Sequence, residues 1–455
     1  MSERDWEQRE LHFIAIGGAG MSGLALVCRQ LGAVVSGSDR AESSYLRRLR
    51  EVGIEARVGH DADAVPRGAE VVISTAIGED NPELARARQR GQRVLHRGEL
   101  LAELCALKRL IAVSGTHGKT TTSGMLVHAL RAIGAEPCFL LGGELPGAGP
   151  NGETANACWG GGEWVVAEAD ESDGSFLELH PEIAVVTNVE FDHHARWSSL
   201  GELLAAFGRF AHPAVGLALY ADPALDGLSG PQRTIRYGLE LLAAPERAGR
   251  EADPVDVENA ELLGTLALPG RHNLANARAA LAAITLAGLD REAAAAALRR
   301  FPGMLRRLER KGSVAGAEVY DDYAHHPTEV AATLAALREL EPRRLIAVFQ
   351  PHLYSRTKAL AGRFGAALSA ADEVGVLDVY PAREQPVGEL AGVSGLDVAR
   401  AAAARACGRP VWWLRDAESA RRALGPRLRE GDLLVTIGAG DVYELADRLI
   451  AEAER

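Results

Sequence analysis

The stretch that decides the fold is Leu110–Thr122, which reads LIAVSGTHGKTTT. An apolar run, Leu110–Val113, leads into a glycine-containing turn, and a helical pattern follows directly. A strand that ends in glycines and enters a helix directs backbone N–H groups and the positive end of the helix dipole at one point. In that setting Gly118 lets the backbone approach a phosphate, Lys119 reaches the β- and γ-phosphates, and the Thr120 hydroxyl binds magnesium. The sequence therefore predicts a nucleoside triphosphate site.

The loop departs from the strict phosphate-loop pattern at one position, because Val113 stands where the first glycine belongs. A glycine turn that serves only tight packing is the alternative, but it leaves Lys119 without a role. The residues that we predict to contact the nucleotide here are Gly115, Thr116, His117, Gly118, Lys119, Thr120 and Thr121.

The composition is that of a soluble globular protein with more than one domain. The chain has 455 residues, of which 47% are apolar and 25% charged, and one ordinary domain rarely reaches this length. The net charge of −12 argues against nonspecific binding to nucleic acid, because the chain offers no basic stripe to a phosphate backbone.

Neither a secretory signal nor a membrane span is predicted. The N-terminus is charged and polar, and no apolar window approaches the roughly 18 residues that a membrane helix needs. The five cysteines lie far apart and form no C-x-x-C pair, which indicates reduced thiols rather than a disulfide framework or a zinc site. We therefore expect a cytoplasmic protein.

A second glycine-rich turn lies near the N-terminus. A predicted buried strand runs into Gly18, Gly20 and Gly23, which satisfy G-x-G-x-x-G, and a second strand ends at Asp39. The pattern predicts a diphosphate on a helix N-terminus and a carboxylate near a sugar hydroxyl. Taken alone it suggests a nicotinamide enzyme, but a UDP-sugar also carries a diphosphate, so the pattern does not choose between them.

Two polar clusters follow predicted strands in the middle of the chain. EADESD (168–173) follows one strand, and a segment ending in Asp192, His193 and His194 follows another. Open α/β sheets bind ligands at the carboxyl ends of their strands, so the clusters favour magnesium ligation beside the phosphate loop. Charged loops that face solvent are the alternative for either cluster.

The next segment, 230–265, is polar and weakly periodic, and we expect short strands at Thr234–Arg236 and Thr265–Leu268. Asn273 and Asn276 then stand three apart on one face of an alanine-rich helix. They serve either as N-caps or as donors to a base edge, and the spacing alone leaves both open.

The last third of the chain again alternates predicted strands and helices. Phe301–Gly303 forms a joint, and Arg306 and Arg307 follow it. Paired arginines usually form a solvated surface, but beside a hinge they can clamp a γ-phosphate. A helix is expected from Pro327.

We therefore predict an α/β protein with mostly parallel sheets and three domains, 1–108, 109–301 and 302–455.

Six motifs together resemble the Mur ligase family. They are IGGAGMSG (16–23), SGTHGKTTT (114–122), EADESDGSF (168–176), PGRHNLANA (269–277), DDYAHHPTE (321–329) and FQPHLYSRT (349–357). The third and fifth motifs are similar to the alanine-adding branch rather than to the branches that add glutamate or diaminopimelate.

The resemblance implies a Rossmann-like UDP-binding domain, a central ATPase-like domain and a C-terminal Rossmann-like domain that binds the amino acid. It also implies ATP-dependent amide formation between UDP-N-acetylmuramate and L-alanine, through an acyl phosphate, with two magnesium ions. The partners would be small molecules, with no nucleic acid and no membrane, and the protein would be a monomer or a homodimer.

By motif position, the resemblance implies the following roles. Lys119, Glu168, His193 and Arg307 would be catalytic, and Thr120, Glu168 and His193 would bind metal. Asn273, Asn276, Arg307 and Asp322 would join the phosphate loop at ATP. Gly18, Gly20, Ser22 and Asp39 would bind the UDP-sugar, and His325, His352 and Arg356 the amino acid.

Three features depart from the pattern of the family as a whole. Ala195 replaces an aspartate near the second metal site, and Leu353 stands where many relatives have arginine. The segment 200–212 has no lysine, as is usual in the alanine-adding branch.

Three alternatives remain. A ligase that recycles a whole tripeptide onto the same UDP-sugar shares the chemistry, although the IGGAGMSG form argues against it. A nicotinamide-dependent oxidoreductase leaves Lys119 and Thr120 without a role. A nucleotide-switched binding protein has no use for an amino-acid pocket.

Overall fold

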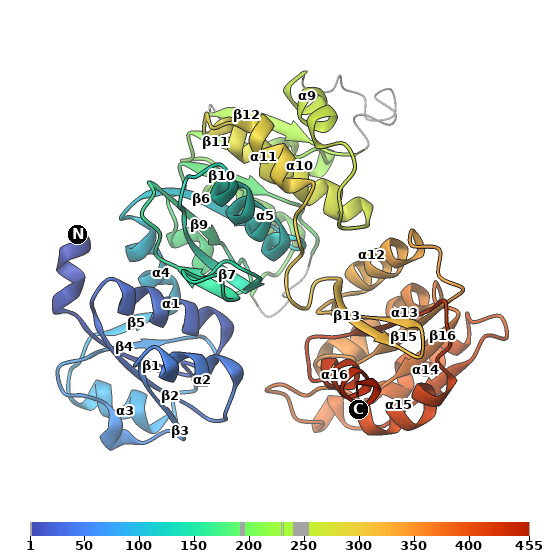
Figure 1. The fold of residues 1–455 in the computed structure, drawn as a ribbon. Coiled ribbons are helices and arrows are strands. Elements are labelled where there is room, and N and C mark those ends of the chain that lie inside the picture. The colour runs from blue at the N-terminus through green and yellow to red at the C-terminus, as the bar shows by residue number, and fades with distance from the viewer. Residues whose placement is uncertain (1, 192–195, 229, 231, 240–253, 455) are drawn as a thin grey trace. The chain divides into compact units, whose positions relative to one another are not determined.

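The protein, described here from a computed structural model, contains three sheets (Figure 1). The structure describes residues 2–191, 196–228, 230, 232–239 and 254–454. The predicted α/β class with mostly parallel sheets is confirmed. Among the described residues, no helix is long and apolar enough to cross a membrane.

The N-terminal sheet is entirely parallel, in the order β3-β2-β1-β4-β5. Its strands are β1 (Glu10–Ile14), β2 (Val34–Asp39), β3 (Glu55–Val58), β4 (Glu70–Ile73) and β5 (Val94–His96). Its helices are α1 (Ala19–Gln30), α2 (Ser44–Glu51), α3 (Pro82–Gln89) and α4 (Arg97–Cys105). Strands β2 and β3 are added on one side of β1, and β4 and β5 on the other side, so the strand order switches at β1. The helix α1 follows β1 and therefore begins at the point where such folds bind a diphosphate.

The central sheet has the order β12-β11-β10-β6-β9-β7-β8 and is parallel except for β8. Its strands are β6 (Arg109–Ser114), β7 (Cys138–Leu145), β8 (Ala155–Cys158), β9 (Trp164–Glu168), β10 (Ile183–Val186), β11 (Gly216–Tyr220) and β12 (Arg233–Tyr237). The helices are α5 (Lys119–Ala132), α6 (Leu200–Ala211), α9 (Pro254–Leu263), α10 (Arg271–Leu286) and α11 (Arg291–Leu298). The phosphate-loop strand β6 lies in the middle, between β9 and β10.

The C-terminal sheet has the order β13-β14-β18-β15-β16-β17, with only β13 antiparallel to its neighbour. Its strands are β13 (Glu309–Val314), β14 (Ala317–Asp322), β15 (Arg344–Phe349), β16 (Glu373–Val376), β17 (Val411–Trp413) and β18 (Asp432–Ile437). The helices are α12 (Pro327–Arg338), α13 (Tyr354–Leu368), α14 (Gly395–Ala403), α15 (Ala417–Leu424) and α16 (Tyr443–Ala453). As predicted, α12 begins at Pro327, capped by His326 and Glu329.

The sequence prediction was wrong for some segments. No strand forms at Thr265–Leu268, because the Ala267 N–H donates to the carbonyl of Arg299 at the end of α11 (3.0 Å). The helix α9 forms in a segment predicted only as weakly periodic. The strand β13 was missed because it is a charged edge strand, paired with β14 through a turn with positive φ at Ala315 and Gly316.

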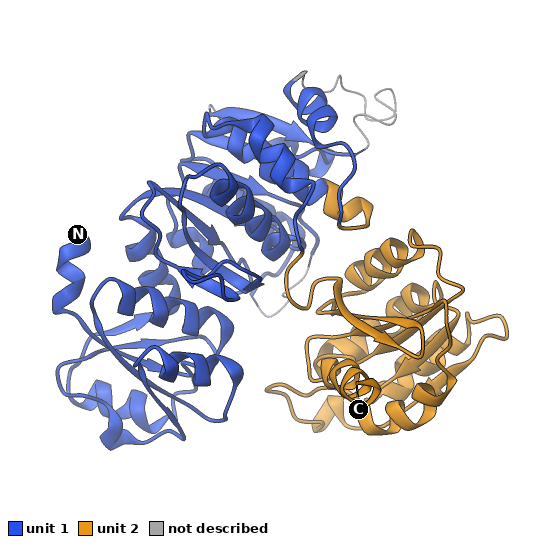
Figure 2. Ribbon diagram, in the orientation of Figure 1, with its two compact units in different colours: residues 1–267, 275–302 blue, residues 268–274, 303–455 orange. Residues whose placement is uncertain are grey.

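The chain divides into two compact units (Figure 2). The first comprises residues 1–267 and 275–302 and contains the N-terminal and central sheets. The second comprises residues 268–274 and 303–455 and contains the C-terminal sheet. The three domain limits predicted from the sequence stay predictions.

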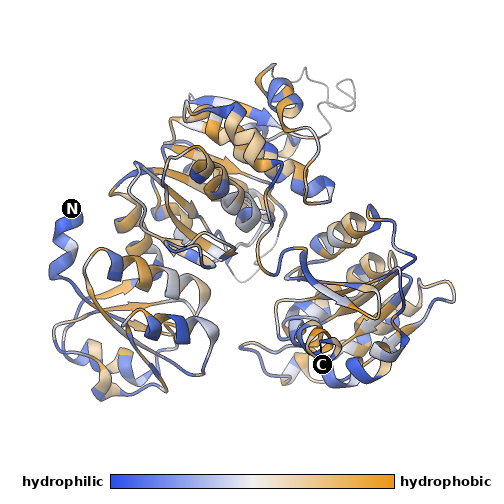
Figure 3. Ribbon diagram, in the orientation of Figure 1, coloured by the Kyte–Doolittle hydropathy of each residue, from blue (hydrophilic) through white to orange (hydrophobic). Residues whose placement is uncertain are grey.

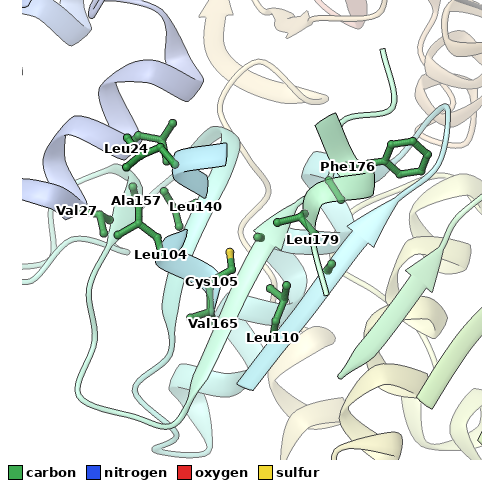
Figure 4. Close-up of a cluster of buried hydrophobic side chains, with 14 of the residues drawn as sticks. Leu24, Val27, Leu104, Cys105, Leu110, Leu140, Ala157, Val165, Phe176 and Leu179 are labelled. Atoms are coloured by element: carbon green, nitrogen blue, oxygen red, sulfur yellow. The ribbon is translucent and has the colours of Figure 1, made fainter. Parts of the chain in front are cut away.

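One hydrophobic core joins the N-terminal and central sheets within the first unit. It includes Leu24 and Val27 of α1, Leu104 of α4, and Ala157 and Val165 of the central sheet, whose side chains gather in Figure 4. The strands that supply this core are mostly hydrophobic along their length (Figure 3). The two sheets, which belong to separate domains of the three-domain α/β architecture, therefore share buried contacts within the first unit.

The third glycine of the N-terminal fingerprint explains how closely α1 packs on β8. A β-carbon on Gly23 would lie 3.1 Å from that of Ala157, and the Asn156 amide donates to the carbonyl of Ala19 (2.7 Å). Such contact is closer than most β-carbons allow, so glycine at this position permits the approach of helix and strand.

This shared core yields a stability prediction. Replacing the buried Leu24 by alanine should destabilise the first unit by about 2–5 kcal/mol, since it removes methyl groups and leaves a cavity between α1 and β8. Urea unfolding followed by circular dichroism measures the change. The exposed Val52→Ala is the control, with an expected effect within about 0.5 kcal/mol. Equal losses in the two variants would contradict a shared core.

Candidate nucleotide and amino-acid sites

The phosphate loop connects β6 to α5 through two glycines with positive φ. Gly115 has φ +132° and Gly118, the N-cap of α5, has φ +83°. A β-carbon on Gly115 would lie 2.1 Å from Oγ1 of Thr187, and one on Gly118 would lie 2.5 Å from Oδ1 of Asn276. Both positions therefore require glycine for conformation and for space.

The segment after β10 holds the backbone of the phosphate loop in place. Oγ1 of Thr187 donates to the carbonyl of His117 (2.7 Å), and Oδ1 of Asn188 accepts from the His117 N–H (2.9 Å). The Thr116 N–H donates to the Asn188 carbonyl (2.9 Å), and the Thr116 hydroxyl donates to the Glu190 carbonyl (3.0 Å). These bonds fix the loop backbone at Thr116 and His117 and use the N–H groups of both residues, so a phosphate would bind to N–H groups nearer the start of α5.

Lys119 is held by a buried carboxylate. Its ammonium donates to Oε2 of Glu171 (2.7 Å) and to the carbonyls of Gly115 (2.6 Å) and Thr116 (3.2 Å). Burial alone would lower the pKa of Lys119, but the charges of Glu171 and two further carboxylates raise it. The lysine is therefore charged and oriented within the loop.

Carboxylates gather at the carboxyl end of β9, beside the loop. Register places Glu168 opposite Val113 of β6, and Oε2 of Glu168 accepts from the Gly142 N–H (3.0 Å). Asp170 is only partly buried, and the charges of Lys119 and then Arg97 outweigh the cost of its burial and lower its pKa. The residues fit a magnesium site, because Thr120 supplies a hydroxyl oxygen in the first turn of α5, which follows β6, and Glu168 supplies carboxylate oxygens at the end of the neighbouring strand β9. His193, predicted as a further ligand, lies outside the described residues.

The two predicted asparagines are both buried in α10. The Asn273 amide donates to the carbonyl of Pro269 (2.7 Å), so this side chain is tied to the loop that precedes its own helix. Asn276 lies over Gly118 in the first unit, at the distance given above. The structure thus places Asn276 at the phosphate loop, and its role at the base stays a prediction.

The N-terminal fingerprint residues lie at the start of α1. Gly18 is the N-cap, and Oδ2 of Asp39 accepts from the Gly17 N–H (2.9 Å), so this carboxylate braces the turn. Ser22 is buried, and its hydroxyl donates to the carbonyl of Ala19 (3.0 Å) and accepts from Asn156 (3.3 Å). Gly20 remains a position where the backbone can approach a diphosphate. Ligand contacts by these residues stay predictions.

In the second unit, the paired arginines have different surroundings. Arg306 pairs with Asp321 (3.1 Å) and donates to the carbonyl of Gly438 (2.8 Å). The Arg307 guanidinium lies 5.0 Å from the centre of the Tyr323 ring. Burial raises the pKa of Asp322 to about 6, although the charge of Arg307 lowers it.

The three predicted amino-acid-binding residues come together. The rings of His325 and His352 are 6.1 Å apart, and His352 stacks on Tyr380 at 5.8 Å. Burial lowers the pKa of His325 to about 4, with a further contribution from the charge of Arg356. Burial, then His325 and Arg356, lower that of His352 to about 4. Two neutral imidazoles beside a guanidinium can receive an amino acid's carboxylate and its amine.

Sequence reasoning missed three residues of these sites. Glu171 stood in a quoted motif, but its pairing with Lys119 depends on how the loop turns after β9. Arg97 lies at the start of α4 and ion-pairs with Asp173 (2.8 Å), with no local sequence signal. Tyr380 lies after β16 and pairs with His352 in a parallel bridge, so the contact between their rings depends on the pairing of the sheet and not on local sequence.

Family models match three successive segments of the chain. Residues 10–109 match the Mur ligase family, catalytic domain, and residues 113–284 match the Mur ligase middle domain. Residues 306–440 match the Mur ligase, glutamate ligase domain.

Curated relatives named UDP-N-acetylmuramate–L-alanine ligase align along nearly the whole chain. The protein from Mycolicibacterium vanbaalenii is 45% identical, over 98% of this chain and 97% of its own length. The protein from Streptomyces coelicolor is 42% identical, over the same shares.

Solved structures share the fold. The UDP-N-acetylmuramate-alanine ligase MurC from Thermotoga maritima matches with a TM-score of 0.81 and 27% identity, covering 98% of this chain and 99% of that one. A murein peptide ligase from Psychrobacter arcticus gives 0.69 and 23%, covering 97% and 98%. MurF from Thermotoga maritima in complex with ADP gives 0.59 and 15%, covering 87% and 97%.

The buried ion pair at the phosphate loop can be tested directly. Glu171→Gln should lower the free energy of unfolding by about 3–5 kcal/mol, because it leaves the Lys119 charge buried with less compensation. Saturating ATP should restore more stability to this variant than to the wild type, because the phosphates then pair with Lys119. Urea unfolding with and without ATP measures both effects.

Its matched control is Glu182→Gln, which breaks a more exposed pair with Arg109 in the same sheet. The expected cost is about 0–1 kcal/mol. If Glu171→Gln cost no more than this control, Glu171 would not hold the lysine.

The histidines predict how the stability of the second unit depends on pH. The pKa of His325 is depressed from 6.5 to about 4 in the folded protein. Its contribution to stability is therefore present above pH 6.5 and lost as the pH falls toward 4. His325→Gln should lose less stability than the wild type across that window, as measured by urea unfolding. Parallel curves would show that His325 titrates normally, since Asp322 titrates in both proteins.

Proposed function

The chain belongs to the Mur ligase family, and from that premise we propose that it joins L-alanine to the lactyl carboxylate of UDP-N-acetylmuramate, with ATP as the energy source. The observation that carries this proposal is identity of 41–46% to alanine-adding ligases over nearly the full chain. It is an ATP-dependent ligase of peptidoglycan precursor synthesis. We place the enzyme in the cytoplasm, as a monomer or a homodimer.

The reaction needs an activated carboxylate, because a carboxylate oxygen is a poor leaving group. The muramate carboxylate attacks the γ-phosphorus of ATP, giving an acyl phosphate and ADP. The neutral amine of L-alanine then attacks the acyl carbon, and the tetrahedral intermediate expels phosphate. The first step brings two anions together, so cationic groups must neutralise their charge.

The residues of the phosphate loop suit the first step. The N–H groups at the start of α5 and the charged Lys119 would bind the phosphates, and Asn276 lies next to Gly118. Glu168 and Thr120 would hold magnesium, with His193 at a second ion; bound magnesium neutralises phosphate charge. Two ions are our proposal, supported by the oxygen ligands that Thr120 in the first turn of α5 and Glu168 at the end of β9 offer.

In the second unit, Arg307 suits the γ-phosphate and Arg356 the alanine carboxylate. Asp322 lies beside Arg307, and Asn273 near the start of α10 is proposed on the adenine side. His325 and His352 are neutral near pH 7, so neither repels the ammonium form of the incoming amino acid. Leu353 has φ +70° at the start of α13 and contributes no charge there.

The UDP-sugar is proposed on the N-terminal sheet. Gly18 and Gly20 would approach the diphosphate at the start of α1. Asp39 would reach a sugar hydroxyl while bracing the turn, and Ser22 supports the helix from beneath.

Joining a whole tripeptide is the nearest alternative. The murein peptide ligase from Psychrobacter arcticus shares the fold at 23% identity, which says nothing of substrate. The curated relatives at higher identity favour L-alanine.

The decisive experiment is phosphate release from ATP and magnesium with UDP-N-acetylmuramate, with and without L-alanine, and then with the tripeptide. We expect release that needs both UDP-sugar and L-alanine, and a product heavier by one alanyl residue in mass spectrometry. Lys119→Ala should abolish release, because it removes the ammonium group that lies within the phosphate loop, and should still bind the UDP-sugar. Release only with the tripeptide would overturn the proposal.

A further inference from the structure

Arg97 connects two parts of the first unit. It is the first residue of α4, and its Nη2 donates to Oδ2 of Asp173 (2.8 Å) and to Oδ2 of Asp170 (3.3 Å). Both carboxylates belong to the segment 168–173, which starts at Glu168, the last residue of β9, and also carries Glu171. One guanidinium nitrogen is thus anchored on the carboxylate loop, 168–173.

The other terminal nitrogen of Arg97 faces the glycine turn. A β-carbon on Gly20 would lie 3.7 Å from Nη1 of Arg97, so the guanidinium borders the first turn of α1. A cation next to the positive end of a helix dipole is unfavourable unless an anion is shared between them. Asp173 and Asp170 compensate the charge on the Nη2 side.

From this geometry we infer that Arg97 binds the diphosphate of the UDP-sugar through Nη1 while Nη2 stays on Asp173, which ties the sugar nucleotide to the carboxylate loop beside Lys119. The inference rests on the proposed function, since the diphosphate is that of the proposed substrate. Planar guanidinium groups can serve two anions at once, because their five donors point in fixed directions.

The carboxylate loop extends this contact toward the phosphate loop. Asp170 feels the charges of both Lys119 and Arg97, and Glu171, one residue on, holds the lysine ammonium. Glu171, which holds Lys119, thus lies in the sequence between Asp170 and Asp173, which hold Arg97. Binding of the diphosphate to Arg97 would stabilise the loop in the position that orients Lys119.

Binding of UDP, measured by isothermal titration calorimetry on the full-length protein, tests the inference. Arg97→Gln should raise the Kd for UDP by about 10- to 100-fold, the usual effect of losing a charge-assisted hydrogen bond. The KM for the UDP-sugar should rise by a similar factor. Arg93→Gln is the matched control, because Arg93 pairs with Glu70 and Glu103 instead, and its Kd for UDP should stay unchanged.

Asp173→Asn separates direct contact from support of the loop. It weakens the anchor of Nη2 but keeps the guanidinium, so UDP affinity should fall less than in Arg97→Gln. If the two variants lost the same affinity, Arg97 would act only by holding the loop, and the inference would fail. ATP binding shows whether Arg97→Gln has folded. If Arg97→Gln does not bind ATP, Arg97→Lys takes its place, because lysine keeps the positive charge. Arg97→Lys should bind UDP with an affinity between those of the wild type and Arg97→Gln.

Unchanged affinity for UDP in Arg97→Gln would also overturn the inference. That failure is distinct from failure of the proposed function, which would show as no alanine-dependent phosphate release by the wild type.

Discussion

The phosphate loop depends on hydrogen bonds from the segment after the neighbouring strand. The register pairs Ser114, the last residue of β6, with Val186, the last residue of β10, so the two strands end side by side. Thr187 and Asn188 then bond to the backbone of Thr116 and His117. Two glycines with positive φ would otherwise make this loop a flexible segment. The hydrogen bonds from Thr187 and Asn188 hold the loop in one conformation before any nucleotide binds, which reduces the entropy cost of ordering the loop on binding.

Burial of charge follows from the same arrangement. Glu171 is fully buried and Lys119 nearly so, and such a pair is stable only when each partner has further hydrogen bonds. The loop carbonyls of Gly115 and Thr116 supply them for the lysine. The ion pair therefore depends on the hydrogen bonds from Thr187 and Asn188, which hold the loop backbone that carries those carbonyls. The shared hydrophobic core contains side chains of α1 and α4. It therefore fixes the position of α4, whose first residue, Arg97, donates to Asp173 in the carboxylate loop.

The sequence predicted the elements whose signals are local. The strand–glycine–helix pattern at 110–122, the fingerprint at the start of α1 and the helix start at Pro327 all depend on neighbours in the chain. The edge strand β13 could not be predicted, because a charged strand has no apolar alternation to reveal it. The pairing of Glu171 with Lys119 and the position of Arg97 result from loops that are far apart in sequence, which no spacing rule encodes.

The adjacent arginines show how backbone geometry assigns different tasks to neighbours. Arg306 and Leu308 both have positive φ, which turns the chain sharply on either side of Arg307. Arg306 is thereby directed to Asp321 and to two carbonyls after β18, so it is structural. Asp322 accepts from the N–H groups of Leu308 (2.7 Å) and Ala324 (2.8 Å), one with each oxygen. With both oxygens bonded to backbone, Asp322 fixes the segment that carries Arg307, so the position of the guanidinium depends on these two bonds.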